Sequence, residues 1–280
     1  MHVNLDFLEK RRREVRNLVI RALGKSSHAH IGGILSVLEV ITALYFHILN
    51  VDPKKPRWDG RDYFVLSKGH AGPVLYAALA IRGFFDREEL FTLNEGNTIL
   101  PSHVNRVDTP GVDMTCGSLG QGLSAAVGMA YGLRADKKSN SVYCIIGDGE
   151  SQEGQIWEAA MCAAHVKLDN LIVFCDNNKG QVDGYTRDVN NVEPLEKKWE
   201  SFNWYVDRIN GHSIEDICTS VDNAKKVTGK PKMIILDTFK GNAAPQYHNT
   251  GVNHCVNFTP EQAEELIAYW EKNEVHGKDR

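Results

Sequence analysis

The sequence lacks several signals that would place it in a specialised class of protein. No apolar run reaches membrane-spanning length: residues 34–49 come nearest, but they contain Ser36, Glu39, Thr42 and His47. The N-terminus shows no apolar segment of a secretory signal, so we expect no export. No G-x-G-x-x-G follows a first strand, which excludes a dinucleotide-dependent dehydrogenase.

Paired cysteines and an excess of basic charge are also missing. The six cysteines show no C-x-x-C spacing, and several fall inside predicted strands and helices, as buried reduced thiols do. A net charge of −4 and a pI near 6.3 give no reason to expect nucleic acid as a partner. We therefore expect a cytoplasmic protein that binds neither nucleic acid nor membranes.

Strand patterns and helix patterns alternate along the chain. At 280 residues and 42% hydrophobic, the sequence can bury a full core. Strands are predicted at residues 62–66, 142–146, 171–175, 204–209 and 233–237. Helices are predicted at residues 5–23 (stopped by Gly24), 34–49, 73–82, 121–134, 156–166 and 213–227, and from Thr259 onward. This order predicts one three-layer α/β domain over residues 1–280, with a mainly parallel central sheet flanked by helices.

The most informative stretch is residues 142–184. Two apolar, β-rich runs enclose an Ala-rich helical pattern, which is typical of a right-handed βαβ unit. Polar turns follow both strands, Gly147-Asp148-Gly149 after the first and Asp176-Asn177-Asn178 after the second. Ligands in such units bind at the carboxyl ends of the strands, so both turns are expected on one edge of the sheet.

These turns carry chemistry suited to a phosphate and a metal. Gly149 is expected to open a helix, whose free N–H groups favour a phosphate. Asp148 and Asn178 each offer a side-chain oxygen, and the carbonyl of Gly180 offers a third. Hard oxygen ligands completed by phosphate and water are what Mg²⁺ prefers. The alternative is that these are two ordinary turns, because Gly-Asp-Gly alone is common.

A long segment without regular structure is predicted at residues 94–120. Loops of this length in a compact domain are usually functional or disordered. Its glycines and His103 favour a functional loop.

Together, these motifs carry a family resemblance. GDG followed by NN after an interval of 27 residues resembles the thiamine diphosphate binding motif. The segments that match further are WDGRDYFVLSKGHAGPVLYAALAIRGFF, LPSHVN, TPGVDMTCGSLGQGLSAAVGMAYG and GDGESQEGQIWEAA. They resemble transketolase, specifically its N-terminal, diphosphate-binding half, from about residue 12 to about residue 270.

The resemblance implies a role for each matching residue. Thiamine diphosphate would be the cofactor, held through Mg²⁺ (or Ca²⁺ or Mn²⁺ in its place). The implied metal ligands are Asp148, Asn178 and the carbonyl of Gly180. The implied cofactor contacts are His70, Gly117, Leu119, Gly149, Asn178 and Val182. The implied catalytic residues are His30, His103, His254 (rather than His248) and Glu153, a glutamate that in the family connects the two active sites of the dimer.

Each of these residues also has an ordinary interpretation. A single histidine in a loop is usually a surface or hydrogen-bonding residue. That interpretation is kept for His28, His47, His165, His212 and His248. Glu153 alone could be an acid favoured at a helix start.

The implied activity is transfer of a two-carbon ketol unit from a ketose phosphate to an aldose. Full-length transketolases carry a further pyrimidine-binding domain and a C-terminal domain, for which this sequence has no room. The resemblance therefore implies a split transketolase in which this chain acts with a separate subunit carrying those domains, as a heterotetramer.

Other functions remain open at this stage. A deoxyxylulose-phosphate synthase or a dihydroxyacetone-forming relative would use the same cofactor, although GSLGQG and GESQEG favour transketolase. A non-catalytic scaffolding or regulatory subunit could keep the fold. Three departures from the family pattern leave the sugar open: Ala29, Ser102-His103-Val104-Asn105 and Cys116.

Overall fold

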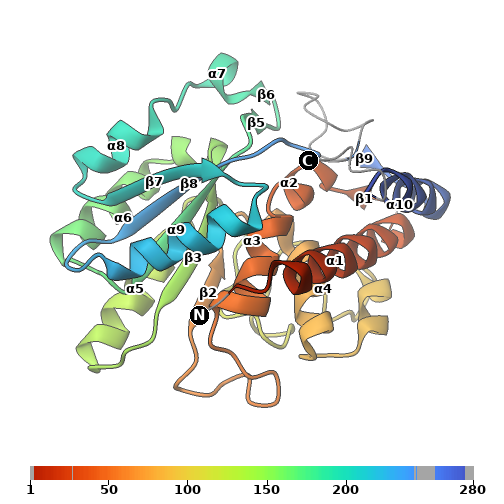
Figure 1. Ribbon diagram of the computed structural model, residues 1–280, viewed down its shortest axis with the longest axis horizontal. Helices are drawn as coiled ribbons and strands as arrows, with labels where there is room; N and C mark the ends of the chain where they lie inside the picture. The colour runs from red at the N-terminus through yellow and green to blue at the C-terminus, as the bar shows by residue number, and fades with distance from the viewer. Residues whose placement is uncertain (1–2, 27, 243, 245–255, 275–280) are drawn as a thin grey trace.

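The computed structural model describes residues 3–26, 28–242, 244 and 256–274. Its centre is a parallel five-stranded sheet in the order β2-β3-β4-β8-β7 (Figure 1). The strands are β2 Tyr63–Leu66, β3 Val142–Gly147, β4 Leu171–Asn177, β7 Tyr205–Asn210 and β8 Lys232–Asp237. The three central strands are buried almost throughout, as parallel strands covered on both faces must be. All five predicted strands are confirmed.

Helices cover both faces of the sheet, which confirms the α/β class. The α-helices of the described residues are α1 Leu5–Ser26, α2 Ile31–Leu35, α3 Leu38–Ala43, α4 Gly72–Arg82, α5 Gln121–Ala135, α6 Gly154–His165, α7 Thr186–Val189, α8 Leu195–Ser201, α9 Ile214–Lys226 and α10 Pro260–Glu274. The chain moves from β3 to β4 in one direction and from β7 to β8 in the other. Because such crossovers are right-handed, α6 and α9 lie on opposite faces. Helix α5 packs with α6, α3 packs with α9, and α1 packs against α4 and α10 (Figure 1).

Two short strand pairs were not predicted. β1 (His28–Ala29) pairs with β9 (Val256–Asn257), and β5 (Gly180–Gln181) forms a hairpin with β6 (Gly184–Tyr185). Two residues per strand are too few to produce a period-2 pattern. The β5–β6 hairpin has Val182 in its turn, beside the proposed site.

The single helix predicted at residues 34–49 is wrong. The chain forms α2, α3 and then one π-helical turn, Leu44–Ile48. The break falls at Ser36, whose hydroxyl donates to Asp176 Oδ2 at 2.7 Å and also reaches the carbonyl of Gly33 at 3.2 Å. A tertiary contact at the end of β4 therefore interrupts a mainly apolar segment whose sequence predicts one continuous helix.

Gly24 does not stop the first helix, which continues to Ser26. A side chain at position 24 would lie 3.0 Å from the Cβ of Ala263 and 3.1 Å from the Cα of Pro260. Gly24 therefore lets α10 approach α1 closely. Thr259 caps the start of α10, because Thr259 and Gln262 exchange hydrogen bonds at 2.9 and 3.3 Å.

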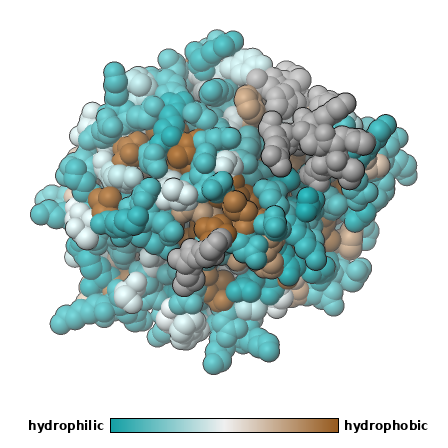
Figure 2. Space-filling model, viewed as in Figure 1, coloured by the Kyte–Doolittle hydropathy of each residue, from teal (hydrophilic) through white to brown (hydrophobic). Residues whose placement is uncertain are grey.

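The face of the molecule in Figure 2 is mainly hydrophilic, and its apolar side chains lie in small groups between polar ones. Within the described ranges, none of the helices combines the length and the apolar character needed to cross a membrane.

Candidate functional site

The site is built on the carboxyl ends of β3 and β4. Gly147 lies beside Asp176 in the sheet, and the Asp148 N–H donates to the Asp176 carbonyl at 3.1 Å. On the other side of β4, Asn177 lies beside Asp237 at the end of β8. The two polar turns thus lie together on one edge, as the sequence predicted.

Asp148 is a buried carboxylate at this edge. Its side chain is only 1% exposed, and its two oxygens accept hydrogen bonds from the backbone N–H groups of Gly149 and Lys179, each at 2.7 Å. Burial, followed by repulsion from Asp176, raises the pKa of Asp148 to about 7 despite these hydrogen bonds. A cation bound beside Asp148 would favour its ionised form.

Asn178 is oriented by its neighbours. Its amide nitrogen donates to Asp176 Oδ2 at 2.8 Å, while its Oδ1 accepts from the Gly180 N–H at 3.0 Å. A Cβ placed at Gly180 would lie 3.6 Å from Asn178 Oδ1 and 3.4 Å from Lys240 Nζ. The Asn178 oxygen, Gly180 and the Lys240 ammonium therefore lie side by side.

The helix expected to begin at Gly149 is instead a short 3-10 turn, Gly149–Gln152, and α6 begins at Gly154. The Gly149 N–H is also engaged by Asp148. The structure therefore does not support the expectation that a helix N-terminus at Gly149 binds a phosphate. Gly149 instead packs closely on the β5–β6 hairpin, because a Cβ there would lie 3.2 Å from the Cβ of Gln181.

Lys68 and Asp176 form a buried ion pair that sequence reasoning missed. The Lys68 ammonium lies 2.5 Å from Asp176 Oδ2, with side chains 2% and 0% exposed, and it also donates to the Gly33 carbonyl at 3.0 Å. Burial acts to raise the pKa of Asp176, but Lys68 and the hydrogen bonds outweigh it and lower that pKa. Charged residues directly after buried strands are the signal that could have found this pair.

Three of the four predicted catalytic or cofactor histidines lie together. The ring centroid of His30 is 5.7 Å from that of His70 and 6.2 Å from that of His103. Burial, and then the neighbouring His103, lower the pKa of His30. His70 lies next to the ion pair, because a Cβ at Gly33 would be 3.1 Å from His70 Nε2 and 3.6 Å from Lys68 Nζ. His254 lies outside the described residues.

The segment containing Gly117 and Leu119 lies against the end of β2. A Cβ at Gly69 would overlap the carbonyl oxygen of Cys116, so only glycine permits this contact. Buried Glu150, also missed in the sequence, fixes the end of this segment: it accepts from Gly120 N–H at 2.9 Å and Gly147 N–H at 3.0 Å, and from the Ser67 hydroxyl.

The remaining predicted residues are exposed around the site. Val182 is 62% exposed and Leu119 is 39% exposed, so both could cover a bound apolar ring. Glu153 is exposed, and its Cβ would lie 3.0 Å from a Cβ at Gly120. Glu153 is thus beside the segment of Leu119.

A further buried lysine, Lys240, joins this site from the segment after β8. It is 3% exposed, and its ammonium donates to the Gln181 carbonyl at 3.0 Å. Burial, and then Lys68, lower the pKa of Lys240. The sequence signal that could have identified Lys240 as a site residue is its position shortly after a predicted strand.

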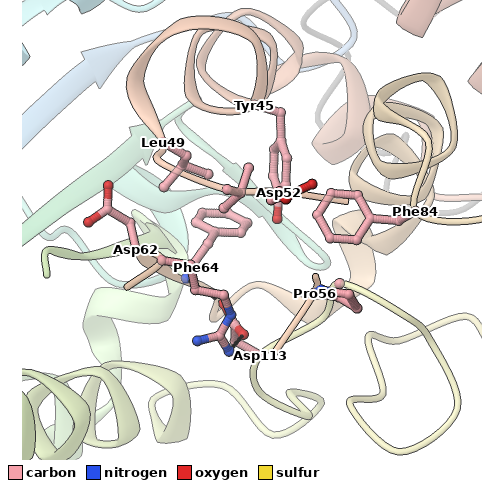
Figure 3. A pocket seen from close by; sticks show the side chains of 11 residues that line it. Tyr45, Leu49, Asp52, Pro56, Asp62, Phe64, Phe84 and Asp113 are labelled. Carbon is pink, nitrogen blue, oxygen red and sulfur yellow. Dashed lines mark hydrogen bonds and ion pairs between the residues drawn. The ribbon is translucent and has the colours of Figure 1, made fainter. Parts of the chain in front are cut away.

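Two hollows are found near β2 and His30. One is lined by Leu23, His30, Pro73, Leu93, Asn94 and Ser102, and so adjoins the histidines. The other, shown in Figure 3, gathers Tyr45, Phe64, Phe84 and Asp113 at the amino end of β2. That second pocket lies at the opposite end of β2 from His70 and takes no part in this site.

The donor set fits a hard divalent cation held with a diphosphate. Asp148 would provide a buried carboxylate and Asn178 its side-chain oxygen, and phosphate oxygens would complete the shell. Within the described residues, there is no group of three or more histidine, cysteine, aspartate or glutamate side chains that could hold a metal ion. A site with one carboxylate therefore depends on its ligand for further oxygens.

The fold and the site define a class: an α/β domain whose functional residues gather at the carboxyl edge of a parallel sheet. Residues 9–275 match the family described as the transketolase thiamine diphosphate binding domain. The chain belongs to this family and corresponds to the N-terminal part of transketolase, which confirms the resemblance seen in the sequence.

Named relatives support this assignment. The chain is 51% identical over 258 residues to the 6-deoxy-6-sulfo-D-fructose transketolase subunit of Clostridium sp. (strain MSTE9), covering 92% of this chain and 94% of that protein. It is 38% identical over 265 residues to an apulose-4-phosphate transketolase subunit of Phocaeicola vulgatus, with 95% and 94% covered. Both relatives are named as transketolase subunits.

Solved transketolases share the fold. The enzyme of Pichia stipitis in complex with sedoheptulose 7-phosphate matches with a TM-score of 0.85 and 28% identity over 96% of this chain. The enzyme of Campylobacter jejuni matches with a TM-score of 0.85 and 27% identity over the whole chain. This chain spans only 44% and 48% of those two proteins.

Proposed function

We propose that this chain is the N-terminal subunit of a split transketolase. It binds thiamine diphosphate through Mg²⁺ and, with a separate subunit, transfers a two-carbon ketol unit from a ketose to an aldose. The family match and the buried Asp148 at the sheet edge support this proposal. Ca²⁺ or Mn²⁺ could replace Mg²⁺ at a site of this donor type.

The observation that carries the proposal is the environment of Asp148. A carboxylate that is 1% exposed and close to Asp176 is costly to ionise in the absence of a cation. In this proposal, the cation binds Asp148, the Asn178 oxygen and the Gly180 carbonyl. The nearby ammonium of Lys240 adds positive charge for the diphosphate.

When bound, thiamine diphosphate supplies the nucleophilic carbon and the electron sink that cleavage beside a ketose carbonyl requires. The chain's own residues hold the diphosphate end and position protons. His30, whose pKa is lowered, is neutral at pH 7 and can accept a proton from a sugar hydroxyl. His103 and, by resemblance, His254 are proposed to hydrogen-bond the sugar, while Glu153 is proposed to connect paired active sites.

The proposed partner supplies the rest of the active site. Two relatives of similar length are named as subunits, and this chain spans under half of the solved transketolases. We infer a partner with the pyrimidine-binding and C-terminal domains, assembled with this chain as a heterotetramer. The exposed Leu119 and Val182 would then be covered by the cofactor and this partner.

The proposed substrates are sugars with an acidic terminal group. The relative at 51% identity is named for 6-deoxy-6-sulfo-D-fructose, and another is named for apulose 4-phosphate. We propose the sulfonated ketose as the first donor to test, with a ketose phosphate as the alternative. A cytoplasmic location fits the free thiols of the described cysteines.

The proposal is tested by calorimetric titration of thiamine diphosphate into the chain with Mg²⁺ and, separately, with EDTA. We expect binding only with Mg²⁺. Asp148→Ala should weaken binding by more than about tenfold, since even outer-shell changes at metal sites cost that much. The matched control is Asp136→Ala, at an exposed aspartate that follows α5.

Binding that is equal in EDTA, or unchanged in Asp148→Ala, would contradict the metal site. No binding by the wild-type chain, alone or with its partner, would favour a non-catalytic scaffolding role.

A further inference from the structure

His212 connects the buried side of α3 to the segment after β8. It follows β7, and its Nε2 accepts a hydrogen bond from the backbone N–H of Phe239 at 2.9 Å. Its Nδ1 lies 3.2 Å from Glu39 Oε2. Because a backbone N–H can only donate, Nε2 carries no proton, and the neutral ring is protonated on Nδ1 and donates to Glu39.

Buried Glu39 stabilises this tautomer by accepting the hydrogen bond from His212 Nδ1. It lies in α3, is 3% exposed, and has Arg12 Nη1 at 3.8 Å. The ring of His212 also stacks on that of Phe239, with centroids 6.0 Å apart and planes inclined by 11°. The imidazole is therefore fixed on two edges and one face.

The residues on either side of Phe239 both reach the proposed diphosphate site. Thr238 donates to Asp176 Oδ1 at 2.5 Å, and Lys240 donates to the Gln181 carbonyl at 3.0 Å. The only backbone N–H between these two contacts is that of Phe239, which His212 holds.

We propose that His212 is a positioning residue for the diphosphate site. In its Nδ1-protonated form, held by Glu39, it fixes the Phe239 N–H and thereby places Lys240 beside Gly180. This inference rests on the proposed function and adds to it a residue outside the proposed site itself. It separates His212 from the other histidines to which the sequence assigned an ordinary role.

Three variants test the role of His212. His212→Leu removes both the acceptor and the donor, and His212→Asn is too short to reach both Glu39 and Phe239. His212→Gln keeps one acceptor and one donor on a longer side chain. The matched control is His165→Leu, at an exposed histidine that ends α6.

Two measurements are made on each variant. Amide hydrogen exchange of Phe239 in the cofactor-free chain reports the His212 hydrogen bond directly. Titration with Mg²⁺ and thiamine diphosphate reports the affinity of the site. For His212→Leu and His212→Asn we expect faster exchange at Phe239 and a Kd raised about tenfold, as for other outer-shell residues. His212→Gln should recover most of both, and His165→Leu should match the wild type.

The measurements distinguish the proposed positioning role of His212 from a role in stability alone. The latter would lower the free energy of unfolding while leaving the Kd of the folded variants within twofold of the wild type, and that result would overturn the inference. If His212→Leu does not fold, His212→Asn decides the question. If the wild-type chain binds no thiamine diphosphate, the proposed function fails first, whereas unchanged Phe239 exchange in the variants would refute only the part played by His212.

Discussion

Lys68 and Asp176 place opposite charges in the interior, where their mutual attraction and hydrogen bonds must offset the loss of water. Asp176 accepts from Lys68, Ser36 and Asn178 on one oxygen and from Thr238 on the other. One carboxylate thus connects β2, the α2–α3 break and the segment after β8. Removing the Lys68 ammonium would leave the Asp176 carboxylate buried without its positively charged partner.

We therefore predict that Lys68→Met lowers the free energy of unfolding by about 3–5 kcal/mol, the range for breaking a buried pair. The matched control is Lys138→Met. Lys138 pairs with Asp59 at 3.5 Å, with side chains 36% and 84% exposed, so its loss should cost less than about 1 kcal/mol. Urea denaturation measures both, and equal effects would refute the buried-pair argument.

The histidine cluster makes a prediction about protonation. Burial lowers the pKa of His30, and a positive charge on His103 lowers it further. We expect the pKa of His30 to lie below the ordinary value of about 6.5 and to rise in His103→Ala, because that variant removes the second cause but not the burial. An NMR titration of the His30 ring measures this. An unchanged pKa in His103→Ala would contradict the cluster geometry.

Among the elements, α5 shows how one helix uses glycine in two ways. A Cβ at Gly122 would lie 2.7 Å from the Cα of Ser67, so this end of α5 packs directly on the end of β2. At Gly132 the same Cβ would meet nothing within 4 Å. One glycine permits a close approach and the other only adds freedom to the unfolded chain.

We predict opposite signs for two substitutions in this helix. Gly122→Ala should destabilise the chain by about 1–3 kcal/mol, because the backbone at Ser67, directly after β2, must move. Gly132→Ala should stabilise it by up to about 1 kcal/mol through helix propensity and lost unfolded-state entropy. Thermal unfolding of the two variants provides the measurement, and destabilisation by both would argue against the described packing of α5.

The elements also show what sequence patterns can predict. Buried parallel strands, such as β3 and β4, have continuous apolar runs, and these can be recognised from the sequence alone. The break at Ser36 was not predictable, because it depends on a hydroxyl bound to Asp176, 140 positions away. The extension of α1 through Gly24 likewise depends on α10.

At the scale of the whole molecule, topology assembles the site. Parallel strands end on one edge, so Asp148 and Asn178 could be paired from sequence alone, and the family resemblance supplied the histidines. Lys68, Lys240, Glu39 and His212 could not be assigned in this way, because their roles depend on contacts between distant segments. The proposed need for a partner also belongs to this scale, since the described site is proposed to bind only the diphosphate end of the cofactor.

The most direct test of the central claim is a ketol-transfer assay of the purified chain, alone and mixed with the candidate partner. Mg²⁺, thiamine diphosphate, an aldose acceptor and either 6-deoxy-6-sulfo-D-fructose or a ketose phosphate are supplied. We predict turnover only in the mixture, and none when the chain carries Asp148→Ala. Turnover by the chain alone at the rate of the mixture would contradict the account.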